Sequence, residues 1–530
     1  MKTLAGTGPL LRLALRRDRV VIASTLAFLF AMTAGSVRAT VDLYPDAASR
    51  RTAALAAESM PAMVALYGHI HDLDGVGGVG LAKLVIIDAL TLVALVVMVM
   101  RRHTRQEEES GRLELLGSQV MGRRAPLASA TILSLATSLV AGALAAAAAV
   151  AGGLPTLDGC VFGAGLAGLG LAWTGVMAVL VQLVESNRTT GALGWGAFGL
   201  CFVLRAVGDV TAGRSTGFLV WASPLGWEQQ MRPGPDHRWW PLALSVALLV
   251  VGLAIGDALL HRRDLGTGLF AARPGPAQGT LHGPLALTWR LERSGIWLWT
   301  LSFAALGAMS GAVLDDLGGF MQPEASDMLR KMGGSGDLQG LYVGVIALFG
   351  GLMAACMGLT CALGLRREET AGHLEAVLST GASRLDVLRA RTVIAVLGSC
   401  AAGAAMALAL AVAHALASGQ WDRFAGDLGA LLVPLPAVFV CVALALALVG
   451  TLPRQSWLAW LTLGLFALLG ELGAMLHLPP WTMKLSPFAW LPKVPAEPMR
   501  WAPVAGVTVV AVLLLVAAGW GFRRRDLPVG

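Results

Sequence analysis

The chain has 530 residues, of which 56% are hydrophobic and 14% are charged, and its formal net charge is +7. This is more apolar surface than a water-soluble core can bury, so the composition excludes a soluble globular enzyme and indicates a membrane protein. The Lys and Arg residues form short clusters beside apolar runs, where lipid headgroups account for them, so the positive charge does not indicate nucleic-acid binding.

Apolar runs of about 20 residues recur along the chain, and this is the length that a helix needs to cross a bilayer. A β-barrel would show short alternating segments instead. We therefore predict an all-α, polytopic membrane protein with about twelve transmembrane helices. The expected spans are 20–37, 81–100, 127–151, 161–184, 191–210, 241–260, 296–314, 341–364, 392–416, 430–450, 456–476 and 503–522.

A basic segment precedes the first span and places its arginines at helical spacing. It predicts an amphipathic elbow helix in the membrane interface over 10–19, and a counterpart over 285–293 precedes the seventh span. A plain positive anchor at the inner headgroups is the alternative. The elbow candidates are Arg12, Arg16, Arg19, Trp289, Arg290 and Arg293.

The basic clusters favour one orientation of the chain. Most of the Lys and Arg residues lie in segments on the same side of the expected spans as the amino terminus, and positive segments near span ends resist translocation. We expect a multi-pass protein of the bacterial inner (plasma) membrane with both termini in the cytoplasm.

The cytoplasmic loops carry an internal repeat. The segment 107–123 (EEESGRLELLGSQVMGR) aligns without gaps with 368–384 (EETAGHLEAVLSTGASR), 261 residues further on. Two shorter matches occur at nearly the same offset: 223–227 with 486–490, and 262–265 with 524–527.

This repeat predicts a fused pseudo-dimer. Each half has six expected spans and begins and ends inside, so the halves are parallel and related by an axis along the membrane normal. We expect halves at 1–265 and 285–530, joined by a Gly/Pro-rich cytoplasmic linker at 266–284.

Each copy of the repeat starts with consecutive glutamates and continues with apolar residues. Because the inner headgroups are anionic, this surface faces a protein or water. A short helix with an acidic start and an apolar face suits a groove in a partner, and a solvated helical hairpin is the plainer interpretation. The docking candidates are Glu107, Glu108, Gly111, Leu113, Glu114, Glu368, Glu369, Gly372, Leu374 and Glu375.

The segment from Arg105 to Leu115 (RQEEESGRLEL) and the segment from Arg262 to Phe270 (RRDLGTGLF) resemble those of actinobacterial ABC exporter permeases of the polyketide-antibiotic or multidrug efflux type. The resemblance implies a fused twelve-helix permease that works with two copies of a separate nucleotide-binding ATPase, which holds ATP and Mg²⁺. It also implies that the two acidic loops are coupling helices. The cargo would be a hydrophobic or amphipathic drug, antibiotic or lipid.

The chain itself carries no phosphate-binding loop of the form G-x-x-x-x-G-K-[ST], so we expect no ATP hydrolysis by this chain alone. We assign it no catalytic residue, cofactor or metal site, because the alternating His69, His71, Asp72 and Asp74 are a weak metal signal. The absence of the loop also fits two other functions, a proton-coupled multidrug carrier and a non-transporting membrane partner of an ATPase.

Ionisable residues inside expected spans are costly unless they are paired, so each is a functional candidate. These are Asp88, Arg205, Asp209 and Glu471. Arg205 and Asp209 are four residues apart and share a helix face, which favours a local ion pair. We also expect Arg205 to approach Glu471 of the other half across the pseudo-two-fold axis.

Overall fold

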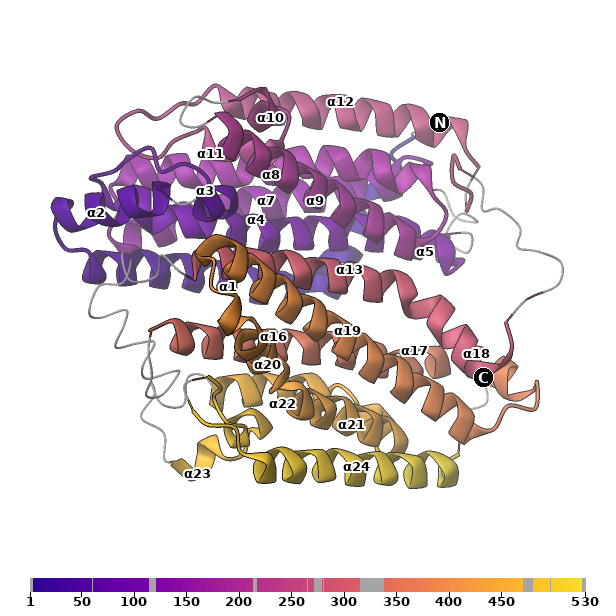
Figure 1. The fold of residues 1–530 in the computed structure, drawn as a ribbon. Helices are drawn as coiled ribbons and strands as arrows, with labels where there is room; N and C mark the ends of the chain where they lie inside the picture. Colours follow the sequence, from indigo (N-terminus) through magenta and orange to yellow (C-terminus); the bar gives the residue numbers. More distant parts are fainter. Residues whose placement is uncertain are drawn as a thin grey trace. The chain divides into compact units, whose positions relative to one another are not determined.

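The protein is seen in a computed structural model that describes residues 3–59, 61–113, 121–212, 217–264, 266–270, 279, 281–314, 338–469, 480–495 and 497–526 (Figure 1). Among these residues there is no strand, and 11 helices are long and apolar enough to cross a membrane. The predicted all-α polytopic class is confirmed. The expected span at 456–476 corresponds to the shorter apolar helix α22 (Leu458–Ala467), and residues 470–479 lie outside the described part.

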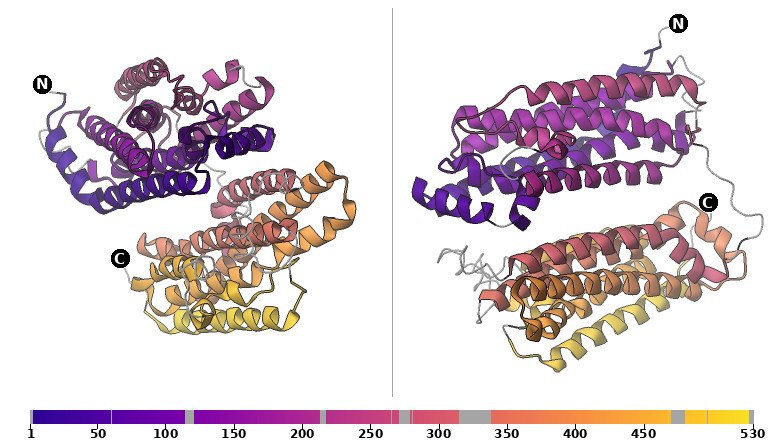
Figure 2. Two further views of the ribbon diagram at one scale, coloured as in Figure 1. Left: turned by 90° about the vertical axis from the view of Figure 1, so that its left-hand side faces the viewer. Right: turned by 45° about the horizontal axis from the view of Figure 1, so that its top comes forward.

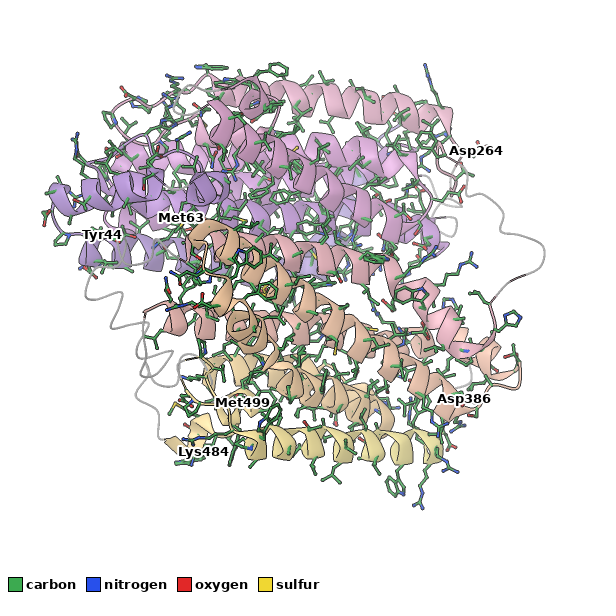
Figure 3. All side chains as sticks on the ribbon, viewed as in Figure 1. Tyr44, Met63, Asp264, Asp386, Lys484 and Met499 are labelled. Carbon is green, nitrogen blue, oxygen red and sulfur yellow. The ribbon has the colours of Figure 1, made fainter. Side chains whose placement is uncertain are left out.

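The chain forms two compact units, Met1–Gly275 and Pro276–Gly530. Their boundary falls inside the stretch 266–284 that the sequence suggested as a linker. Within each unit the long helices lie side by side as a bundle (Figure 2). Tyr44 and Asp264 lie at opposite ends of the first bundle, and Lys484 and Asp386 at opposite ends of the second (Figure 3).

The first unit is built around α8, which packs against α4, α7 and α12. A Cβ on Gly142 of α7 would lie 2.4 Å from the carbonyl oxygen of Gly163 of α8, so only glycine permits this approach of the two backbones. Its long helices are α1 (Thr7–Leu43), α4 (Val76–Arg102), α7 (Ala125–Gly152), α8 (Thr156–Leu183), α9 (Asn187–Ala212) and α12 (Pro241–Arg262). Its short helices are α2 (Ala47–Glu58), α3 (Pro61–Tyr67), α5 (Arg105–Glu109), α10 (Phe218–Trp221) and α11 (Pro224–Gln229).

The second unit repeats this arrangement of neighbours. The pairs α13 with α19, α16 with α21, and α21 with α24 correspond to α1 with α7, α4 with α8, and α8 with α12. Its long helices are α13 (Gly283–Val313), α16 (Leu338–Ala362), α19 (Arg384–Ser418), α21 (Leu435–Thr451) and α24 (Trp501–Arg524). Its short elements are α17 (Gly364–Thr370), α18 (His373–Leu378), η1 (Trp421–Arg423), α20 (Phe424–Leu432), η2 (Pro453–Gln455), α23 (Pro480–Met483) and η4 (Pro487–Trp490).

The expected elbow segments are the first turns of long helices. Arg12, Arg16 and Arg19 belong to α1, which is continuous from Thr7, and their side chains are exposed. Trp289, Arg290 and Arg293 likewise lie exposed on the continuous helix α13. The structure therefore has no separate elbow helix at either place, because neither segment contains a helix-breaking residue before the apolar run.

Candidate functional site

The two acidic loops follow α4 and α16 and have the same backbone plan. In the first unit, α5 ends before Gly111, whose φ is 70°. In the second, α17 ends before Gly372, whose φ is 76°. A Cβ on either glycine would meet nothing within 4 Å, so the left-handed backbone, not lack of space, explains why glycine recurs in the repeat.

In the first unit, Glu108 holds the acidic loop to the end of α12. Its two carboxylate oxygens accept from Arg263 at 2.7 and 2.9 Å, and Arg105 donates to it at 2.9 Å. Arg263 also donates to the side chain of Gln182 at 2.6 Å and to the carbonyl of Thr267 at 2.9 Å. The Glu108 side chain is only 7% exposed, so this Arg–Glu–Arg triad is an internal contact.

The second unit builds the same triad from the repeated residues. Glu369 accepts from Arg525 at 2.6 and 2.8 Å, and Arg366 lies 3.0 Å from it. The Glu369 side chain is 2% exposed. Bidentate pairs of this kind fix geometry as well as charge. We refer to the two clusters, Arg105–Glu108–Arg263 and Arg366–Glu369–Arg525, as the loop clamps.

A second repeated arginine completes the attachment at each helix end. Arg123 donates to the carbonyls of Leu260 and Arg263, the first at 2.9 Å. Arg384 donates to the carbonyl of Arg525 at 2.7 Å. A cation at the carboxyl end of a helix satisfies free carbonyl groups and complements the helix dipole.

The preceding glutamates make different contacts in the two units. Glu107 pairs with Arg17 of α1 and lies 3.6 Å from Arg112. Glu368 pairs with Arg391 of α19, which also donates to Glu292 of α13 at 2.7 Å. The loops are thus tied to different helices at this position.

Each loop combines a buried leucine with exposed residues. Leu113 and Leu374, predicted to face a partner, are 4% and 3% exposed and anchor the loop inward. Arg112, His373 and Glu375 are charged or titratable side chains that lie exposed just after the repeated backbone turn, and Glu109 lies exposed just before it. Glu114 lies outside the described residues.

The sequence missed the arginine partners of the acidic residues. The RRDL repeat at 262–265 and 524–527 was visible, but nothing in its local pattern showed that Arg263 and Arg525 reach back to the acidic loops. The signal that could have shown it is that both motifs recur at nearly one offset, and a pair repeated together is expected of residues in contact.

Both halves of the chain match a family of known proteins. The family described as "Multidrug efflux system permease Rv1217c, C-terminal domain" matches residues 11–260 and 281–523. The chain belongs to this family of multidrug efflux permeases. It is 35% identical to the multidrug efflux system permease protein Rv1217c of Mycobacterium tuberculosis (strain ATCC 25618 / H37Rv) over 528 residues, which cover 98% of this chain and 95% of that protein.

The far end of the permease's first unit contains Arg205 and Asp209, two of the expected intramembrane charges. Arg205 lies 3.4 Å from Asp209 on α9, and it also donates to the carbonyls of Ala65 and Leu66 at 2.7 and 3.0 Å. The pair therefore secures α3 against α9. Glu471 is outside the described residues, so its expected approach to Arg205 stays a prediction.

Beside this pair, His69 joins two segments of the permease. Its Nδ1 lies 2.8 Å from Glu58, and its Nε2 lies 3.1 Å from the carbonyl oxygen of Asp209. The hydrogen bond to Glu58 raises the pKa of His69 above its ordinary value. Both imidazole nitrogens of His69 thus hold the segment after α3 in place, so we assign His69 a structural role.

The shorter repeat also has the same geometry in both halves of the permease. The indole nitrogen of Trp227 donates to the carbonyl of Trp221 at 2.6 Å, and that of Trp490 donates to Lys484 at 2.7 Å. Each tryptophan therefore bonds back six residues and closes a compact turn. Pro224 and Pro487 begin the turns, where a missing N–H costs nothing.

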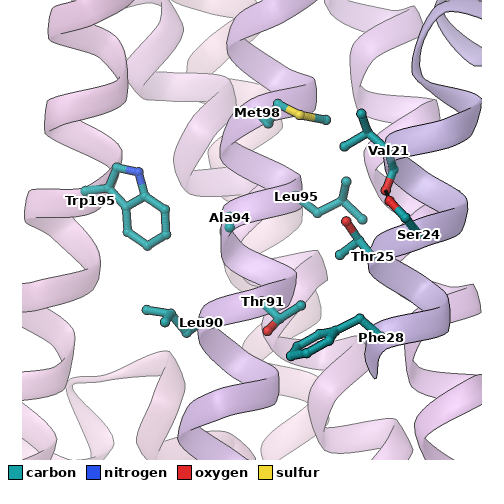
Figure 4. Close-up of a pocket in the computed structure, with 10 residues that line it drawn as sticks. All are labelled: Val21, Ser24, Thr25, Phe28, Leu90, Thr91, Ala94, Leu95, Met98 and Trp195. Carbon is teal, nitrogen blue, oxygen red and sulfur yellow. Dashed lines mark hydrogen bonds between the residues drawn. The ribbon is translucent and has the colours of Figure 1, made fainter. Parts of the chain in front are cut away.

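An apolar groove runs along α1, α4 and α9 of the permease's first unit (Figure 4). Its volume is about 550 Å³, within the range of drug-sized ligand sites. Three hydroxyl groups, of Ser24, Thr25 and Thr91, and the indole of Trp195 interrupt an otherwise apolar lining. The remaining lining residues are Val21, Phe28, Leu90, Ala94, Leu95 and Met98.

Proposed function

We propose that this permease is the membrane subunit of an ATP-driven ABC exporter and that a separate nucleotide-binding ATPase docks on each of its two acidic loops. The observation that carries the proposal is the repeated loop clamp, which holds the described start of the acidic loop by the same contacts in both units. Two copies of one ATPase subunit need two equivalent docking places on a single chain.

The loop clamps also supply a path for motion. A displacement of α5 or α17 is passed to α12 or α24 through the bidentate contacts of Glu108 and Glu369. ATP and Mg²⁺ belong to the partner subunits, and this chain contributes the transport path. Closing of the two ATPase subunits on ATP would then move both final helices together.

The proposed orientation places the acidic loops in the cytoplasm of a bacterial cell, with both termini on the same side of the inner membrane. Arg12, Arg16 and Arg19 then lie at the inner headgroups, as do Arg290 and Arg293. Trp289 is exposed at the same level and suits the interface.

The proposed cargo is a hydrophobic or amphipathic compound. The groove of Figure 4 is wide enough for one and offers hydroxyl groups and an indole to orient its polar part. Such a lining suits drugs, antibiotics or lipids better than sugars or inorganic ions.

Co-purification with the ATPase tests the docking directly. Glu375 is exposed, and Glu114 is its equivalent in the sequence of the first loop. The double variant Glu114→Lys with Glu375→Lys therefore reverses one charge in each loop and replaces no clamp residue. We expect two ATPase copies per wild-type permease by native mass spectrometry and none with the double variant.

The matched control is Asp422→Lys, an exposed charge reversal at the other end of the second unit, which should retain both copies. Retention of both ATPase copies by the double variant would show that the partner binds elsewhere.

A further inference from the structure

A buried carboxylate lies in the first unit without a partner. Glu228, in α11, is 5% exposed, and neither of its carboxylate oxygens has a hydrogen-bond partner among the described residues. Gly165 of α8 makes room for it, since a Cβ there would lie 3.3 Å from the Cγ of Glu228. An ionised carboxylate in such surroundings is costly until a proton or a cation neutralises it.

Glu228 lines a small cavity between α4, α8 and the segment that follows α3. The cavity volume is about 50 Å³, which holds a few waters or the ammonium end of a larger molecule but not a whole drug. Two aromatic side chains, of Tyr67 and Phe162, share the lining, and aromatic rings attract cations.

The cationic neighbours of Glu228 are engaged elsewhere. Arg205 donates to the carbonyls of Ala65 and Leu66 and pairs with Asp209. Arg232 donates twice to the side chain of Gln230, at 2.8 and 3.1 Å. The positive charges around the cavity therefore leave the carboxylate of Glu228 without a donor.

The remaining titratable groups around the cavity do not neutralise Glu228 either. Burial raises the pKa of Glu228 well above its ordinary value. Burial also lowers the pKa of His71 to about 4, so this imidazole is neutral at pH 7. Asp88 on α4 accepts from Thr33 of α1 at 2.8 Å and adds a further acidic group. The other titratable side chains in the lining are Tyr67, His69 and Asp72.

The second unit has a cavity at the equivalent place with different chemistry. Leu491 follows Trp490 as Glu228 follows Trp227, and it lines a cavity of about 40 Å³ with Phe488 and Leu348. The fold thus provides this cavity in both units. At this position the first unit has an acidic residue and the second has a leucine.

We propose that the Glu228 cavity is a cation subsite, which binds the ammonium end of an amphipathic cargo molecule and releases a proton in exchange. The empty site holds Glu228 as the carboxylic acid. When an alkylammonium enters, the O–H bond breaks, the proton passes to water, and the carboxylate forms an ion pair with the ammonium. Charge and atoms balance, with one cation bound and one proton released for each site.

The identity of the ligand as cargo rests on the proposed export function, but binding can be measured on the permease alone. Dansylcadaverine ends in a primary ammonium, and its N-acetylated form has the same fluorophore and chain without the charge. We expect wild-type permease in lipid nanodiscs to bind dansylcadaverine with release of about one proton, and its affinity to rise as pH rises toward the pKa of Glu228.

Two substitutions at one position isolate the carboxylate. Glu228→Gln keeps the shape, and Glu228→Leu introduces the residue of the second unit. Both should bind dansylcadaverine about tenfold or more weakly, with no proton release, since a charge-assisted pair is lost. Both should bind the N-acetylated dye as wild type does, which shows that the protein is folded. Asp422→Asn, an exposed change far along the second unit, should behave as wild type.

Equal affinity of wild type and Glu228→Gln for dansylcadaverine, or binding without proton release, would overturn the proposal, as would failure of wild type to bind this dye. A wrong export function gives a different result, since neither wild type nor Glu228→Gln would then export a neutral compound with ATP. If only the subsite is wrong, both proteins export that compound and the dye-binding measurements alone fail.

Discussion

At the scale of single residues, the acidic repeat divides into buried and exposed carboxylates with different tasks. Glu108 and Glu369 each accept from two arginines inside their own unit. Glu375 points outward and is free to meet a partner in the proposed complex. Glu369 lies in α17 and Glu375 lies in α18, so residues that look alike in the sequence differ because they belong to different short helices.

Removing one clamp carboxylate should destabilise its unit. Glu369→Gln leaves Arg525 and Arg366 without a counter-charge, and breaking a buried pair from one side costs about 3–5 kcal/mol. We expect a lower midpoint of thermal unfolding in detergent. Glu375→Gln, which changes an exposed carboxylate of the same loop, should stay within about 0.5 kcal/mol of wild type. Equal midpoints for the two variants would show that the clamp contributes no stability.

The turn glycines allow a second test at this scale. Gly372→Ala forces a left-handed backbone on a residue with a Cβ, so it should cost roughly 1–2 kcal/mol. Gly429→Ala is the control, because Gly429 lies exposed within helix α20 and an added Cβ meets nothing within 4 Å. The control should be neutral or slightly stabilising in the same unfolding measurement. An equal loss of unfolding free energy in Gly429→Ala would contradict the explanation by the left-handed backbone of Gly372.

At the scale of elements, hydropathy and spacing predicted a large part of the fold but not the contacts of the acidic loop. Long apolar runs define membrane helices because the bilayer imposes their length. The sequence does not show which side chains of a short loop are buried, so Glu108 and Leu113 were assigned to a partner although both are buried in their own unit. Glu228 was missed because it stands alone in a turn that read as a connection between spans.

The segment after α3 should respond to pH through His69. Because the Glu58 contact raises the pKa of His69 in the folded protein, protonated His69 stabilises the fold below its ordinary pKa of 6.5, and this contribution is lost as pH rises through the raised value. The difference in unfolding midpoint between wild type and His69→Gln should therefore shrink as the pH is raised from 6 toward 9. A difference that grows with pH would contradict the Glu58 contact.

Packing of the helices in the first unit depends on close backbone approach. A Cβ on Gly163 of α8 would lie 2.2 Å from the carbonyl oxygen of Gly142 of α7, so Gly163→Ala must push the helices apart and should cost about 1–3 kcal/mol. Gly199→Ala on α9 places its Cβ in open space and should be tolerated. The two variants are compared by their thermal unfolding in the same lipid. Similar losses of stability in both would mean that α7 and α8 can move apart without cost.

At the scale of the whole molecule, the repeated loop clamps, the repeated tryptophan turns and the family match on both halves point to one transport unit used twice in a single chain. The halves are not chemically equal, since Glu228 corresponds to Leu491. In the proposed exporter, two equivalent ATPase contacts would therefore act on two halves that differ in chemistry.

The central claim is that export through this permease is driven by ATP through the two acidic loops. The most direct measurement is uptake of a fluorescent hydrophobic compound into inverted vesicles that contain the permease and its ATPase. We predict uptake with ATP and Mg²⁺, none without nucleotide, and none with Glu114→Lys and Glu375→Lys combined. Uptake driven by a proton gradient in vesicles that lack the ATPase would contradict the account.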